Sequence, residues 1–144
     1  MTPPPLLSLY RRAAREREDA LMFLVSFHAH AHAVDDDIDE PGRPPVNTVD
    51  RCMELAWLTN CPFWRAHHEA LSVVHALIAS TYATSVTTPG PLADTLRLSG
   101  NLMVLAVAWL CGGWVHMQAI AAELWPIVIH DQLTPPAEAP AYPV

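Results

Sequence analysis

Positive charge is scarce in this sequence. Charged residues make up 16% of its 144 residues, Lys and Arg together number 8, and the formal net charge is -7 at pH 7. Proteins that bind nucleic acids neutralise backbone phosphates with clustered basic side chains. The sequence has no such basic stripe, so we expect no nucleic-acid partner.

Cysteine is also rare, and the common cysteine metal motifs are missing. Cys52, Cys61 and Cys111 are widely spaced, and no two of them form a CxxC pair. An odd number of separated cysteines is typical of reduced thiols in a cytosolic compartment. The N-terminal residues lack the basic and apolar stretches of a secretion signal. We therefore expect a cytoplasmic protein.

No apolar run is long enough to cross a membrane as a single helix. The longest run covers residues 102–115, and His116, Gln118 and Glu123 interrupt the sequence that follows. A membrane-spanning helix needs about 20 predominantly apolar residues. The run therefore predicts a buried core helix and no membrane span.

Strand-like alternation and internal repeats are absent, whereas helical signals fill most of the chain. Residues 6–40 contain neither Pro nor Gly, so the sequence predicts one helix there, ended by Pro41 and Gly42. Further helices are expected over about 48–59, over about 62–85 and from Pro91 onward, the last bent at Gly112, Gly113 and Pro126.

Short connections between these segments favour antiparallel neighbours. The sequence therefore predicts an all-α, single-domain bundle of four to five mostly antiparallel helices over residues 1–144. The proline-rich tails, about 1–5 and 134–144, are expected to lie outside the bundle. Hydrophobic residues make up 51% of the chain, so a homo-oligomer or a protein partner is expected to cover part of the apolar surface.

The segment FHAHAHAVDDDIDE, residues 27–40, is the richest motif. At 100° per residue His28, His32, Asp35 and Asp39 share one helix face, and Asp36 lies at its edge. His30 and Asp37 fall on the opposite side and are predicted to be dispensable.

Acidic residues oppose the dipole at a helix C-terminus. This cluster therefore indicates either a bound cation or nearby basic groups such as Arg43 and Arg51.

Polar side chains also recur along the later helices. Arg97, Asn101, His116 and Glu123 lie on one stripe if the last helix is continuous, and His68 and His75 share a face of the helix before it. Polar groups inside a bundle are costly unless they find partners. We therefore predict that these faces meet in one internal polar site. Taken singly, His68, His75 and His116 fit more commonly the role of core histidines that form hydrogen bonds with backbone carbonyls.

The acidic triplet DDxxD suits a hard divalent cation, Mg²⁺ or Mn²⁺, which can in turn hold a phosphate or diphosphate group. Histidine ligands would shift the preference to Zn²⁺ or Fe²⁺. Arg97 and Asn101 are expected to bind such an anionic ligand. An enzyme with this site would perform metal-dependent phosphate or diphosphate chemistry, as a hydrolase or a transferase. The predicted metal ligands are Asp35, Asp36, Asp39, His32, His28, His116 and Glu123.

Residues 27–40 resemble the first aspartate-rich helix of class I isoprenoid synthases, especially those of the squalene and phytoene synthase type. The resemblance implies that Asp35, Asp36 and Asp39 bind Mg²⁺, which grips a substrate diphosphate. The chain is much shorter than those enzymes, and only Glu123 and Asp131 could replace their second acidic motif. A complete prenyl synthase is therefore not expected.

The chain as a whole also resembles small phage-encoded helical proteins. In these, a histidine- and aspartate-rich helix precedes an apolar helix with a CGGW-like turn, here Cys111 to Trp114. This resemblance implies a viral origin, with the host cytoplasm as the location. The alternative function is accordingly a non-catalytic phage-type interaction or structural protein, whose acidic helix end and apolar faces bind a partner.

Overall fold

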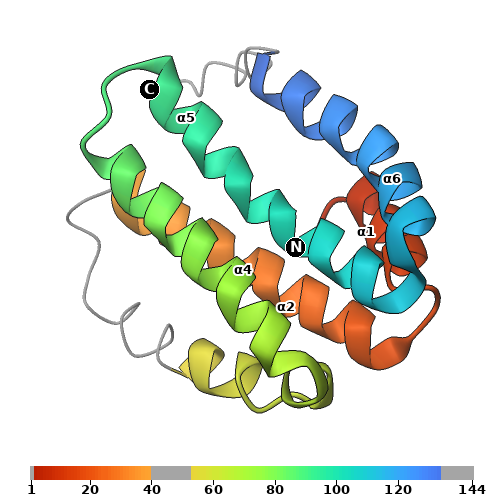
Figure 1. Cartoon of the computed structure of the whole chain (residues 1–144). Coiled ribbons are helices and arrows are strands. Elements are labelled where there is room, and N and C mark those ends of the chain that lie inside the picture. The colour runs from red at the N-terminus through yellow and green to blue at the C-terminus, as the bar shows by residue number, and fades with distance from the viewer. Residues whose placement is uncertain (1, 40–52, 134–144) are drawn as a thin grey trace, which may run out of the picture.

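The structure, a computed structural model, describes residues 2–39 and 53–133; for Asp39 and residues 131–133 only the backbone is described (Figure 1). No strand occurs in these ranges, and residues 53–58 form a short helical segment. The prediction of an all-α bundle is confirmed. The main elements are α1 (Pro4–Ala13), α2 (Glu18–Asp39), α4 (Pro62–Val86), α5 (Pro91–Arg97), the 3₁₀ helix η1 (Leu98–Asn101) and α6 (Leu102–Leu133).

The single helix predicted over residues 6–40 is wrong, because the chain breaks between α1 and α2. Arg15 and Glu16 adopt left-handed backbone conformations, with φ of 50° and 61°. Neither is glycine, so the sequence carries no signal for this corner. A left-handed residue with a side chain costs roughly 1–2 kcal/mol. The corner turns the fully buried Leu9 and Ala13 of α1 into the core, and their burial offsets that cost.

The proline signals locate the later helices well. Pro62 stands in the first turn of α4 and Pro91 in the first turn of α5, as predicted. The helix expected from Pro91 onward is not continuous, because η1 separates α5 from α6. The N-terminal part of the helix expected over 48–59 lies outside the described residues.

The bend predicted at the two glycines is confirmed, and it reverses the chain. Gly113 has φ 80° and ψ -167°, a conformation that is open almost only to glycine. Figure 1 shows the chain turning there, so that the later part of α6 runs back beside α1. Pro126 lies within α6, whose backbone departs from helical values only at Gly113 among the described residues.

The core forms where α1, α2, α4 and α6 meet. Its largest fully buried side chains come from all four helices: Leu9, Tyr10, Phe23, Leu24, Phe63, Leu71, Met103, Val107 and Leu124. The rings of Phe23 and Phe63 lie 5.6 Å apart and join α2 to the start of α4. This packing sets the rotation of α2 about its own axis, and so decides which face of α2 points toward the other helices.

Glycine substitutions at the corner between α1 and α2 distinguish two separate helices from one continuous helix. We expect Glu16→Gly to raise the free energy of unfolding by about 0.5 kcal/mol, because relief of the left-handed strain slightly exceeds the added entropy of the unfolded chain. Glu18→Gly, within the first turn of α2, should instead lower it by about 1 kcal/mol. Chemical denaturation measures both changes, and a loss of stability in Glu16→Gly would contradict the corner.

Candidate functional site

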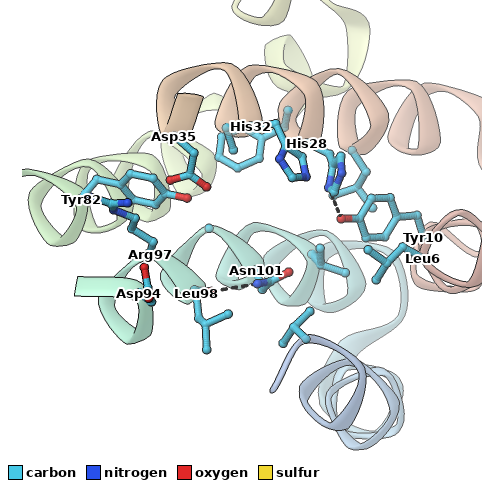
Figure 2. Close-up of a pocket in the computed structure, with 16 residues that line it drawn as sticks. Leu6, Tyr10, His28, His32, Asp35, Tyr82, Asp94, Arg97, Leu98 and Asn101 are labelled. Atoms are coloured by element: carbon cyan, nitrogen blue, oxygen red, sulfur yellow. Dashed lines mark hydrogen bonds between the residues drawn. The ribbon is translucent and has the colours of Figure 1, made fainter. Parts of the chain in front are cut away.

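A cavity of about 280 Å³ lies between α2 on one side and α5, η1 and α6 on the other (Figure 2). α1 and α4 contribute to its ends. Its polar lining consists of Tyr10, His28, His32, Asp35, Tyr82, Asp94, Arg97 and Asn101. Its apolar lining includes Leu6, Leu24, Phe27, Leu98, Val104 and Val128.

The α2 wall of the cavity follows the helical spacing of the sequence. His28, His32 and Asp35 all point toward the cavity in Figure 2. The rings of His28 and His32 meet edge to face, with their centroids 4.5 Å apart. The shared face predicted for these three residues is therefore observed, and it forms one wall of the site.

His28 is held in place from α1. The hydroxyl oxygen of Tyr10 lies 2.8 Å from Nδ1 of His28, within hydrogen-bond distance. Burial, with a further contribution from His32, lowers the pKa of His28 from 6.5 to about 4. Burial also raises the pKa of Tyr10 to about 12. Both groups are therefore neutral near pH 7, and the pair contributes hydrogen-bonding groups without charge.

Arg97 is anchored on the opposite wall by a buried hydroxyl. Its Nε donates a hydrogen bond to Oγ of Ser85 over 3.2 Å, and that hydroxyl donates to the carbonyl oxygen of Tyr82 over 2.6 Å. Ser85 is only 1% exposed, so the anchor is shielded from water. The anchor sets the orientation of the guanidinium at the polar end of the cavity.

The pKa of Tyr82 reflects how close the charged groups lie at the polar end of the cavity. Burial raises its pKa well above the ordinary value, the Asp35 carboxylate raises it further, and Arg97 opposes the rise. Figure 2 accordingly shows Asp35 and Arg97 on either side of the Tyr82 side chain. One carboxylate, one guanidinium and one phenol from three helices thus share a small volume.

Asn101 completes the wall that faces α2. Its Nδ2 donates to the carbonyl oxygen of Leu98 over 3.0 Å, which holds the amide at the cavity lining. Arg97 and Asn101, the two residues predicted to bind an anionic ligand, therefore border the same cavity as His28, His32 and Asp35.

His116 and Glu123 do not join this site, which corrects the prediction that placed them among the metal ligands. Nε2 of His116 lies 3.0 Å from the carbonyl oxygen of Ala13, and Glu123 forms an ion pair with Arg12. Both line a separate groove along α1 and the later part of α6. The single stripe assumed a continuous helix, and the reversal at Gly113 separates its two ends.

Only part of the acidic cluster that begins at Asp35 lines the cavity. Asp36 is exposed and does not line it, and the side chain of Asp39 lies outside the described residues, as do Arg43 and Arg51. In the part of the chain that the structure describes, no group of three His, Cys, Asp or Glu side chains is placed to hold a metal ion.

The remaining histidines have other roles. His30, predicted to be dispensable, has a side chain that is only 14% exposed, and its Nδ1 lies 3.6 Å from Oε2 of Glu54. His75 packs edge-on against Phe27 and Trp64, while His68 is exposed. The polar face predicted for α4 therefore does not converge on the cavity, and α4 reaches it through Tyr82.

The cavity is also lined by three residues that were not predicted to belong to the site: Tyr10, Tyr82 and Asp94. Tyr82 and Asp94 lie on helix faces that already carry other polar residues, so helical spacing was a usable signal for them. Tyr10 had no such signal, because its position depends on the corner between α1 and α2.

Comparison with models of protein families, with curated proteins and with solved structures found no match. The resemblances of residues 27–40 and of the whole chain remain predictions.

The low pKa of His28 gives a prediction for the dependence of stability on pH. Above pH 6.5 the residue is neutral in both the folded and the unfolded chain. Between pH 6.5 and about 4 only the unfolded chain takes up the proton, so stability falls as the pH falls. Because the group is partly solvated, we expect a loss of about 1–2 kcal/mol rather than the full equivalent of the shift.

Urea denaturation at several pH values measures this loss. His28→Gln should flatten the dependence, whereas His68→Gln, at an exposed position, should leave it unchanged. An equally steep loss in His28→Gln would show that other groups cause it.

Proposed function

We propose that this protein binds a divalent cation together with a small molecule that carries a phosphate or diphosphate group. The supporting observation is the meeting of His28, His32 and Asp35 of α2 with Arg97 and Asn101 in one cavity. At about 280 Å³ the cavity is at the lower end of the usual range for ligand sites, so the ligand is small.

The charges of the cavity explain why cation and phosphate are proposed as a pair. Asp35 and Asp94 carry two negative charges against the single positive charge of Arg97, and His28 is neutral near pH 7. A phosphate alone would enter a cavity with a negative balance. A divalent cation beside Asp35 reverses that balance and gives the phosphate a second positive partner.

Each wall has a distinct role in this proposal. Asp35 is the first cation ligand and His32 the second. Water and phosphate oxygens fill the remaining positions, as is usual for Mg²⁺ and Mn²⁺. Arg97, oriented by Ser85, binds the phosphate from the opposite wall. The apolar residues of the lining contact the rest of the ligand.

The proposal predicts that Mn²⁺ and pyrophosphate stabilise the protein cooperatively. Together they should raise Tm by more than the sum of their separate effects, because each supplies the charge that the other lacks. Asp35→Asn and Arg97→Gln should each remove the joint increase. Asp37→Asn is the matched control, because Asp37 is exposed on the same helix and does not line the cavity.

Tm is measured without ligand, with the cation alone, with pyrophosphate alone and with both. Isothermal titration calorimetry then measures the binding itself. An absent joint increase with Mg²⁺, Mn²⁺ and Zn²⁺ alike would reject the proposal. Its full retention in Asp35→Asn would reject the assigned site.

Exposed apolar side chains support a second candidate function, that of a non-catalytic interaction protein. Trp109, Trp114 and Val115 near the reversal of α6 are 49%, 59% and 81% exposed. Aromatic side chains of this kind anchor many protein interfaces. In this function α6 would dock onto a partner, and Trp114→Ala would weaken the complex while leaving cation binding intact.

A further inference from the structure

The outer face of α4 carries no charge. Residues 70–86 contain no Asp, Glu, Lys or Arg, although many of them are exposed. Val73 and Leu77, on the outer side, are 60% and 59% exposed. A surface helix of a monomer usually presents charged residues to water. Loss of charge is instead the compositional mark of the centre of an interface.

The exposed residues on this face are regularly spaced. Ala70, Val73, Leu77, Ser80 and Thr84, here called the outer stripe, follow one another at intervals of three and four residues, and all are exposed. This is the spacing of a helix–helix seam. The core-facing side of α4 has a second seam, in which Leu71, Ile78 and Ser85 are buried. α4 therefore has one seam in the core and another with no neighbour among the described residues.

The polar groups near the outer stripe are already satisfied within α4. Thr84 donates its hydroxyl to the carbonyl oxygen of Ser80 over 3.1 Å, and Thr81 donates to that of Leu77 over 2.8 Å. Ser72 donates in the same way to His68. Removing this face from water would leave these hydroxyls with their partners, so the usual penalty for burying polar groups is small.

We infer that the outer stripe binds a second copy of this chain, with the two α4 helices antiparallel. In that arrangement Val73 of one copy lies opposite Leu77 of the other, and Ala70 lies opposite Ser80. The stripe thus faces itself across a two-fold axis near residue 75, as an isologous interface requires. Small residues at Ala70 and Ser80 allow the helices to approach closely.

The charges at one end of α4 select the antiparallel orientation. Glu69 lies just before the uncharged segment and after the non-helical backbone at His67, and Val86 ends the helix. A parallel pair would place Glu69 beside Glu69 and would also align the two helix dipoles. The antiparallel pair separates these like charges and opposes the dipoles. This inference goes beyond the proposed function, because the outer stripe does not line the cavity.

Sedimentation equilibrium of the full chain tests the dimer directly. We expect the wild-type mass to be twice that of the chain, and Leu77→Glu to halve it, with the dissociation constant raised at least about tenfold. Leu92→Glu is the control, because it makes the same substitution at a 65% exposed site on α5 and should leave the dimer intact. Far-ultraviolet circular dichroism establishes that both variants keep their helices.

A monomeric wild type overturns the inference, as does a Leu77→Glu variant that remains dimeric. A monomer that binds phosphatidylcholine–phosphatidylglycerol vesicles, and loses that binding in Leu77→Glu, also overturns it and assigns the face to lipid.

Cysteine cross-linking tests the orientation. Ala70→Cys protein mixed with Ser80→Cys protein should give a disulfide-linked pair under mild oxidation, identified by mass mapping of the joined peptides. Neither variant alone should link through its new cysteine, because the two copies of each position lie on opposite sides of the axis. A Ser80→Cys protein that links to itself at position 80 would show a parallel pair and overturn the antiparallel arrangement.

Discussion

The reversal of α6 at Gly113 decides which side chains can meet in this bundle. Because the chain turns back there, the later part of α6 packs along α1 and contributes Ile120 and Leu124 to the core. α1 in turn lies where Tyr10 reaches His28 across the end of the cavity. The same reversal moves His116 and Glu123 to a separate groove. A backbone conformation that almost only glycine adopts thus sets both the core and the composition of the site.

The cavity combines groups that would be unfavourable if each were buried alone. Its guanidinium is oriented by a buried hydroxyl, its carboxylate lies beside a phenol, and one of its histidines is kept neutral by burial. Such arrangements, in which the surroundings shift pKa values in opposite directions, are more common at binding sites than elsewhere.

α4 takes part in both proposals, ligand binding in the cavity and association through the outer stripe. One side of this helix supplies Leu71, Ile78 and Ser85 to the interior, and Ser85 orients the Arg97 guanidinium. The other side, the outer stripe, is uncharged and exposed. The two sides are chemically separate, so ligand binding in the cavity and association through α4 can be examined independently.

The sequence by itself determined the helical class, the starts of α4 and α5 at prolines, the bend at the glycines and the shared face of His28, His32 and Asp35. These features depend on local backbone preferences and on the period of a helix. Only the tertiary structure decided that Arg15 and Glu16 form a corner, that His30 faces Glu54, and that Tyr10 and Tyr82 border the site. Left-handed conformations of ordinary residues and the meeting of distant helices depend on burial summed over the whole core, which no local pattern records.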